Sequence, residues 1–383
     1  MQVRQYVISD QALQPTKPHA TLRPEDAQLV LLMAERTHLE AHQPYLFVQA
    51  EFPNATIVTI STAGQIAGVQ LFTNQVVLTA IQFTSPQTKI QTVQVSCANG
   101  EEEAAQNIHR LLPSDGLRAI CLFSDGALVN GTELIDALSS RLPTKTLPIF
   151  GGLAGDGALF EKTLVGIGAD VASGQIVAIG LYGDALELNF GTQGGWSEFG
   201  PERSITHAEK NVLYKIGDRP ALDLYKEYLG KHASQLPSSA LFFPLSMRSR
   251  ETRESHPVVR TILSINEENK SMTFAGSMTE GSKVRLLMSS AEDLIDAASD
   301  AARQANPSGT DQTELALLVT CVGRKLVLGE RTEEELEAVQ AVFGSNTTIA
   351  GFYSYGEISP NIKGVQNCDL HNQTMTIATL SEK

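Results

Sequence analysis

Short apolar runs alternate along the chain with longer amphipathic stretches. Mainly apolar runs cover positions 29–33, 117–123 and 315–321, and helical spacing of apolar residues covers 101–112, 291–305 and 332–342. Short apolar runs bounded by turn residues are typical of buried strands, whereas a period near 3.6 residues is typical of helices. This alternation predicts an α/β protein in which helices pack on mixed sheets.

One strand–helix–strand unit recurs three times. Each copy has a loop that ends in Gly and a residue able to accept a hydrogen bond: Gly64-Gln65, Gly155-Asp156 and Gly356-Glu357. A repeat of this length is typical of a duplicated βαβ-type unit and not of a short-period solenoid. We therefore predict duplicated units that form two related mixed-sheet halves. Because open α/β sheets bind ligands beyond the carboxyl ends of their strands, we expect the ligand site at these loops.

A polar segment with a proline, at positions 232–239, is the predicted domain boundary. It divides the chain into a lead-in at 1–28, an N-terminal domain at 29–231 and a C-terminal domain at 240–383.

The stretch 191–200 is rich in glycine and holds the only tryptophan, Trp196. We expect it to be a surface connection, because it lacks the lysine of a phosphate-binding P-loop.

The overall charge, the apolar runs and the cysteines limit the binding partners and the cellular compartment that can be expected. A net charge of −14 without a basic block argues against nucleic acid and anionic membranes as ligands. No apolar run approaches the length of a transmembrane helix, and the first residues lack the apolar core of a signal peptide. The four cysteines are spread along the chain, which is typical of free thiols. We expect a bacterial cytoplasmic protein without membrane insertion.

Several motifs taken together resemble the FIST family of bacterial sensory proteins. In the N-terminal half they are Phe52-Pro53, 61–64, 150–156 and 217–222 with Tyr225. In the C-terminal half they are 243–245, Val259-Arg260, Gly281, 320–324, 351–357 and 371–374. The resemblance runs from about position 29 to the end of the sequence. Thr320 stands where the family motif usually has Ser, a change that keeps the hydroxyl group.

This resemblance implies a small-ligand sensor that regulates a signalling partner such as a histidine kinase, and it allows a homo-oligomer. A chain without an attached effector domain resembles the NosP-type subgroup, whose members bind haem and sense nitric oxide. The leading expectation is therefore haem b as cofactor. The competing expectation is a sensor without cofactor that binds a small metabolite such as an amino acid.

The candidate ligand contacts lie in the C-terminal motifs and in the second repeat loop. Arg324 is expected either to bind an anionic ligand group or to pair internally with Glu357 or Asp156, since a buried cation needs an anionic partner. His371 either contacts the ligand or holds the neighbouring loop in place, whereas Arg260 is expected to be internal. The full candidate set is Arg324, Gly351, Tyr353, Tyr355, Glu357, His371, Asn372, Gly152 and Asp156.

The candidate axial ligand of a haem is His256. Haem needs an imidazole with a free nitrogen and an apolar pocket, and His256 precedes an apolar run at 258–265. Pro257 restricts the backbone there. The alternative is an exposed loop histidine. Cys368 and His371 have a metal-like spacing, but a zinc site needs two further ligands and no second such pair is present.

An enzyme is the remaining alternative. Cys321, His371, Asn372 and Glu357 could assemble into a cysteine-dependent hydrolase, because such groups meet in space and not in sequence. However, the sequence around Cys321 has no nucleophile-elbow motif, and the N-terminal copy lacks these residues. We therefore expect a non-catalytic sensory module.

Overall fold

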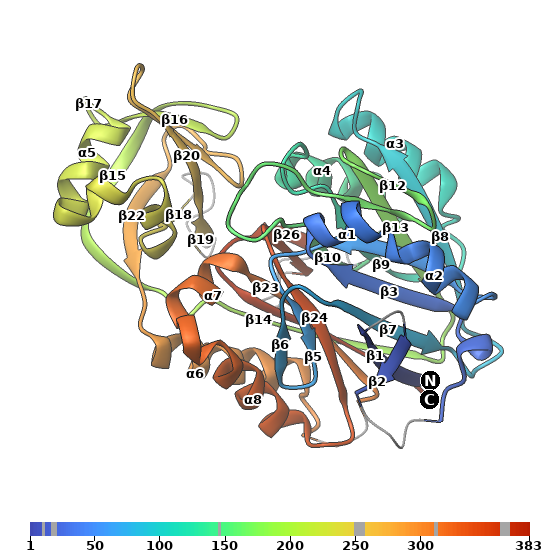
Figure 1. The fold of residues 1–383 in the computed structure, drawn as a ribbon. Helices are drawn as coiled ribbons and strands as arrows, with labels where there is room; N and C mark the ends of the chain where they lie inside the picture. The colour runs from blue at the N-terminus through green and yellow to red at the C-terminus, as the bar shows by residue number, and fades with distance from the viewer. Residues whose placement is uncertain (10–11, 17–20, 145–146, 249–256, 310–312, 361–367) are drawn as a thin grey trace.

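The computed structural model describes residues 1–9, 12–16, 21–144, 147–248, 257–309, 313–360 and 368–383. Within these residues the strands form four sheets, and three of the sheets share one strand order. Parallel and antiparallel pairs occur in each of these three sheets, and helices pack on them (Figure 1). The predicted α/β class with mixed sheets is confirmed.

Three units build these sheets. The first contains β1 (Gln2–Ser9), β2 (Ala12–Pro15), η1 (Pro24–Asp26), β3 (Leu29–Ala34), α1 (Arg36–His42), α2 (Pro44–Glu51), β4 (Thr56–Ser61), β5 (Gln65–Ala67), β6 (Gln70–Phe72) and β7 (Val76–Gln82). The second contains β8 (Lys89–Ser96), α3 (Glu101–Leu111), β9 (Leu117–Ser124), α4 (Gly131–Ser139), β10 (Ile149–Leu153), β11 (Val165–Ile167), β12 (Asp170–Ala172) and β13 (Gln175–Tyr182). The third contains β14 (Leu186–Gln193), α6 (Ala291–Ala305), β23 (Leu315–Cys321), α7 (Val322–Leu328), η4 (Gly329–Arg331), α8 (Thr332–Phe343), β24 (Thr348–Ser354), β25 (Gly356–Pro360), β26 (Cys368–His371) and β27 (Met375–Glu382).

A parallel pair lies at the centre of each sheet. The pairs are β3–β4, β9–β10 and β23–β24, with helices connecting the two strands of each pair. An antiparallel strand, β7, β13 or β27, flanks the first member of each pair. The predicted strand–helix–strand repeat is therefore confirmed in three copies.

The hairpin that follows each parallel pair joins the sheet of another unit. β5 of the first unit pairs with β24 of the third, β11 of the second with β4 of the first, and β25 of the third with β10 of the second. This cyclic exchange ties the units into one body. The duplicated units thus form three related sheets, where the sequence pattern predicted two related halves.

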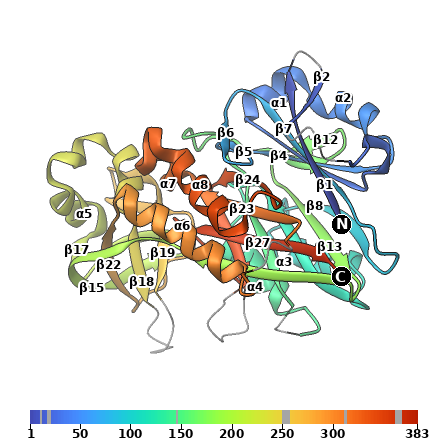
Figure 2. The same ribbon diagram turned by 90° about the horizontal axis from the view of Figure 1, so that it is seen from below.

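The fourth sheet belongs to an inserted unit, residues 197–288, between β14 and α6. Its elements are β15 (Ser197–Glu209), β16 (Val212–Ile216), β17 (Arg219–Pro220), α5 (Ala221–Leu229), η2 (Gly230–Gln235), η3 (Ser238–Phe242), β18 (Leu245–Arg248), β19 (Val258–Arg260), β20 (Ile262–Asn266), β21 (Ser271–Phe274) and β22 (Lys283–Met288). Both views show it as a separate lobe (Figures 1 and 2). The predicted boundary at 232–239 lies inside this unit, across η2 and η3, and stays a prediction.

The alternation of side chains along the strands explains the core. Leu315, Leu317 and Val319 of β23 point into a central cluster shared by the three sheets, whereas Ala316 and Leu318 lie under helices. Successive residues of a strand face opposite sides, so a strand covered on both faces is a continuous apolar run. On the outer face, α6 packs beside α8 (Figure 2).

Two local expectations differ from the structure. The sequence at 40–52 reads as one continuous helix, but α1 begins at Arg36 and ends before Gln43, which has a φ of 44°, and Pro44 starts α2. Proline cannot continue a helix because it lacks the N–H donor. The expected lead-in also contains β1, which pairs with β7 in the first sheet. No helix in the described ranges is long and apolar enough to cross a membrane.

Candidate functional site

The three repeat loops meet at the carboxyl ends of the parallel pairs. The N–H of Ala63 donates to Tyr353 O (2.8 Å), that of Gly155 to Ser61 O (2.9 Å) and that of Tyr355 to Leu153 O (3.2 Å). Each bond links one unit to another, so the three bonds close a ring. We call residues 61–65, 153–157 and 353–357 the crossover ring. Sequence reasoning correctly identified these loops as equivalent.

The second loop is longer than the other two. Ile60 pairs with Val165, Gly152 with Glu357 and Phe352 with Gln65 across the exchanged strands. Gly152 and Val165 are 13 positions apart, whereas Ile60 and Gln65 are five apart, as are Phe352 and Glu357, so the second loop has eight additional residues. We call residues 157–164 the strap.

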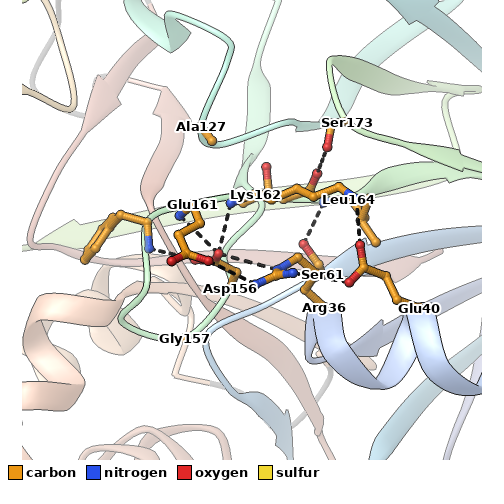
Figure 3. Close-up of polar contacts among 12 residues, drawn as sticks. Arg36, Glu40, Ser61, Ala127, Asp156, Gly157, Glu161, Lys162, Leu164 and Ser173 are labelled. Carbon is orange, nitrogen blue, oxygen red and sulfur yellow. Dashed lines mark hydrogen bonds and ion pairs between the residues drawn. The ribbon is translucent and has the colours of Figure 1, made fainter.

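Asp156 organises the base of the strap (Figure 3). Its carboxylate accepts from the backbone N–H groups of Phe160 (2.9 Å), Glu161 (3.1 Å) and Lys162 (3.0 Å). The hydroxyl of Tyr355 also donates to Asp156, and its ring stacks on Phe160 with centroids 4.3 Å apart. Burial and this contact with Asp156 raise the pKa of Tyr355. The predicted pair Asp156 and Tyr355 therefore lies together, joined by protein contacts.

Charged side chains fasten the strap to α1. Arg36 lies 3.6 Å from Asp156, 3.2 Å from Glu40 and 3.5 Å from Glu161 (Figure 3). Lys162 Nζ is 2.7 Å from Glu40, and this hydrogen bond lowers the pKa of the Glu40 carboxyl. Sequence reasoning missed Arg36, because an arginine at the start of a helix is usually a surface residue.

Glu357 lies on the other side of the ring and is fully buried. The oxygens of its carboxyl group are hydrogen-bonded to Ser354 Oγ (2.7 Å), Thr374 N (3.0 Å) and Thr374 Oγ1 (2.9 Å). Burial outweighs these bonds and raises the pKa of Glu357 to about 8. The carboxyl group is therefore largely protonated at neutral pH, which is unusual for a glutamic acid.

Cys321 is buried nearby, and its Sγ accepts from the N–H of Gly323 at 3.4 Å. Burial raises the pKa of this thiol. A nucleophilic cysteine needs a lowered pKa to supply the thiolate, so the environment of Cys321 does not favour the hydrolase alternative.

Arg324 forms a buried ion pair with an unexpected partner. Its Nη2 is 2.8 Å from Glu335 Oε2, and both side chains are 0% exposed. Tyr353 donates to the other oxygen of Glu335 at 2.6 Å. Arg324 also donates to the carbonyls of Gly194 and Leu294, each at 2.7 Å. Glu335, from α8, thus takes the place expected for Glu357 or Asp156.

Two of the predicted glycines lie within strands. A Cβ at Gly152 of β10 would lie 2.5 Å from Val319 Cγ1, and a Cβ at Gly351 of β24 would lie 1.9 Å from Leu318 O. These positions admit only glycine because neighbouring strands approach so closely. Their ligand role stays a prediction.

Residues 371–374, the junction turn, connect β26 to β27. His371 Nε2, Asn372 Oδ1 and Gln373 Oε1 are buried and accept or donate no hydrogen bond within the described part of the chain. Asn372 donates through Nδ2 to His371 O (3.0 Å), and Gln373 through Nε2 to Leu241 O (3.2 Å). Burial lowers the pKa of His371, which favours the neutral ring. Buried polar atoms are usually paired, so three consecutive residues with unpartnered atoms are unusual.

Two further residues near the predicted site were missed. Gln373 directly follows the candidates His371 and Asn372 and belongs to the motif 371–374, but it was not itself a candidate. Lys325 donates from Nζ to Ala63 O at 2.7 Å and lies over the Tyr353 ring, and burial lowers its pKa. Lys325 thus links α7 to the crossover ring.

The predicted internal role of Arg260 agrees with its bonds to the carbonyls of Ser277 (3.1 Å) and Leu370 (3.3 Å).

The haem candidate His256 lies outside the described residues.

An open groove lies along α1 and α2 and encloses about 1180 Å³, solvent included. His38 and His42 line it with their ring centroids 4.5 Å apart, and Ile8 and Phe47 contribute apolar wall. Burial and the neighbouring His42 lower the pKa of His38, which favours the neutral ring.

Comparison with known proteins adds three findings. Models of the FIST N domain and the FIST C domain match residues 28–219 and 221–360. An uncharacterised protein of Methanocaldococcus jannaschii is 24% identical over 237 residues, which cover 58% of this chain and 44% of that protein. The chain thus spans less than half the length of this relative. The solved structure of a cyanuric acid hydrolase from A. caulinodans aligns with 94% of this chain and 91% of that chain at 9% identity. Its TM-score of 0.31 is too low to indicate a shared fold.

The two domain models together cover most of the chain, with FIST N before FIST C. Tyr225 lies inside the FIST C match, and the motif 371–374 lies beyond it. FIST domains are small-ligand sensory domains of signalling proteins, and the family is non-catalytic. This chain belongs to the FIST family.

Proposed function

We propose that the chain senses a small metabolite with N–H donor groups, such as an amino acid, and that this ligand binds at the junction turn. The supporting observation is the row of unpartnered buried atoms on His371, Asn372 and Gln373. An unpartnered buried polar atom costs about 1–3 kcal/mol, which a ligand with matching groups recovers.

The orientation of the two amides indicates which groups the ligand must supply. Asn372 and Gln373 each donate through the amide nitrogen to a protein carbonyl, so the amide oxygen is the free atom in both. An amide oxygen can only accept. The ligand therefore has to donate, as an ammonium or amide group does. A carboxylate ligand group would instead repel these oxygens.

The test compares binding by the protein and by the variant Asn372→Leu, which has a similar volume and no acceptor. We expect one or more amino acids or primary amines to raise the melting temperature and to bind in calorimetry, and Asn372→Leu to weaken binding at least tenfold. Asn107→Leu, on α3, is the matched control and keeps full affinity. Binding of equal strength by Asn372→Leu would assign the unpartnered atoms to ordered water instead.

Haem-dependent nitric oxide sensing is the second candidate, and the α1–α2 groove favours it. The groove combines apolar wall with two imidazoles, the features that a haem site requires. His38 or His42 would hold the iron, with His256 as the third candidate. Bound haem would supply an iron centre for the gas.

A haemin titration separates these possibilities. We expect a Soret band that saturates at one haem per chain and is lost in one of the variants His38→Ala, His42→Ala or His256→Ala. His109→Ala, on α3, is the control. A titration that does not saturate, or identical spectra in all four variants, would discard the haem reading.

The output of either sensor is proposed to be regulation of a signalling partner such as a histidine kinase. A kinase assay with and without the protein checks this, and ligand must change the autophosphorylation rate. A rate independent of the protein would remove the kinase as partner.

A further inference from the structure

We infer that the inserted unit, residues 197–288, is a hinged element whose orientation is set by hydrogen bonds from the junction turn and its connections. The inference concerns the regulation of the site proposed above, although the hinge itself does not depend on the identity of the ligand.

The inserted unit is structurally independent of the three-unit body. All strands of its sheet come from within residues 197–288, and so do the buried residues of its hydrophobic cluster, which run from Ile205 to Leu286. Units with separate cores move relative to one another unless a large apolar interface prevents it.

Only two segments connect the unit to the body, and they are bonded together. Gly194, Gly195 and Trp196 lead in, and Ser289 and Ser290 lead out. Ser289 Oγ donates to Gly195 O at 2.6 Å. Gly195 has a φ of 74°, and a Cβ there would lie 2.5 Å from Asp293 O, so glycine is required. Paired connections of small residues are typical of a hinge.

The unit and the body are joined by single polar bonds, among them Asn130 Nδ2 to Ser277 Oγ at 3.4 Å. In addition, η3 lies beside α7 and β19 beside β26. Trp196 Nε1 donates to Gln373 O at 2.7 Å, and Gln373 Nε2 donates to Leu241 O at 3.2 Å. Arg260 of the unit donates to Leu370 O at 3.3 Å. On the body side, Arg324 Nη1 fixes Gly194 O at 2.7 Å. The residues just before and within the junction turn therefore carry three of these tethers.

The same turn presents the unpartnered atoms of Asn372 and Gln373. A molecule that bonds to Gln373 Oε1 acts on the residue that holds both Trp196 and Leu241. One net hydrogen bond changes an equilibrium by about two- to tenfold, so a ligand that strengthens or replaces a tether can shift the hinge.

Single-molecule energy transfer on the ligand-free protein tests the hinge. Dyes are attached to Glu102→Cys on α3 and Lys215→Cys on β16, both exposed, with the half-buried Cys97 replaced by Ser. We expect two distance populations. Trp196→Phe and Ser289→Ala each remove one bond and should raise the ratio of open to closed molecules about two- to tenfold.

Two controls complete the experiment. Ser140→Ala removes a similar hydroxyl–carbonyl bond, from Ser140 Oγ to Ala137 O, outside the hinge and should leave the ratio unchanged. A disulfide between Asn130→Cys and Ser277→Cys, whose side chains lie 3.4 Å apart across the interface, should merge the populations until it is reduced.

A single population that Trp196→Phe, Ser289→Ala and the disulfide all leave unchanged, in variants that melt normally, overturns the hinge. This outcome is independent of the calorimetric test of ligand binding, so the hinge and the proposed function fail separately.

Discussion

Glu357 and Arg324 show how burial changes the chemistry of single residues at this site. Each was expected either to contact a ligand or to form an internal pair, and both are fully enclosed by protein partners. Glu357 keeps a proton because the surroundings are too poor in charge and water to stabilise the carboxylate. Arg324 forms an ion pair with Glu335, 2.8 Å away. The protonation and ion pairing of a buried side chain therefore depend first on the groups in direct contact with it.

The pH dependence of stability tests the protonation of Glu357. Its folded pKa of about 8 lies above the ordinary value of 4.5, so between these values the folded protein holds a proton that the unfolded chain releases. The contribution of Glu357 is complete below about pH 4.5 and is lost as the pH rises to 8. Glu357→Gln should remove this slope in urea unfolding from pH 5 to 8, and a variant with the wild-type slope would contradict it.

A double-mutant cycle tests the Arg324–Glu335 pair. Arg324→Met leaves Glu335 as an unpaired buried charge, and Glu335→Met does the same to Arg324, so each should cost about 3–5 kcal/mol of unfolding free energy. The double variant should cost much less than the sum. Strict additivity in denaturant titrations would show that the two side chains do not interact.

At the scale of elements, the strap is the feature that distinguishes the second unit from the others. Its backbone depends on Asp156, which satisfies three N–H groups within seven residues. The ion pairs of Lys162 and Glu161 are largely exposed and contribute little to stability. The conformation of the strap is therefore stabilised more by the buried carboxylate of Asp156 than by its surface ion pairs.

Hydrogen exchange measures this dependence. Asp156→Ala should speed the exchange of the amides of Phe160, Glu161 and Lys162 by about tenfold or more, because they lose their acceptor. Lys162→Met, the matched control, should change the free energy of unfolding by less than about 1 kcal/mol. Unchanged protection of the strap in Asp156→Ala would refute its role.

For the whole molecule, the cyclic exchange of hairpins decides what can fold alone. A fragment of residues 1–231 lacks β24, the partner of β5, and β25, the partner of β10. It therefore leaves the second, third and fourth sheets incomplete, although it contains the whole region that matches the FIST N domain.

Two shortened proteins test this arrangement. The fragment 1–231 should fail to give a cooperative thermal transition, because unpaired strand edges leave backbone groups unsatisfied. A chain in which a short Gly-Ser linker replaces residues 197–288 should keep a cooperative transition, since all three exchanged sheets are retained. A stably folded fragment 1–231 would contradict the exchange.

Local patterns predicted the repeated strands, the helices α3, α6 and α8 and the equivalence of the three loops, since these depend on neighbouring residues. Contacts between distant segments could not be predicted in this way. Glu335 belongs to the acidic run 333–335 and resembles a surface residue, yet it is the buried partner of Arg324. Gln373 belongs to the motif 371–374, but its contacts with Trp196 and Leu241 join segments that are distant in the sequence. The ligand contacts of the candidate residues stay predictions.

The exchanged hairpin also has a consequence for biosynthesis. Ile66 of β5 pairs with Gly351 of β24, which the ribosome adds 285 residues later. At about 5–20 residues per second, this corresponds to tens of seconds during which the edge of β5 has no partner. An unpaired edge invites pairing with other chains. The newly made protein should therefore depend on chaperones until its third unit emerges.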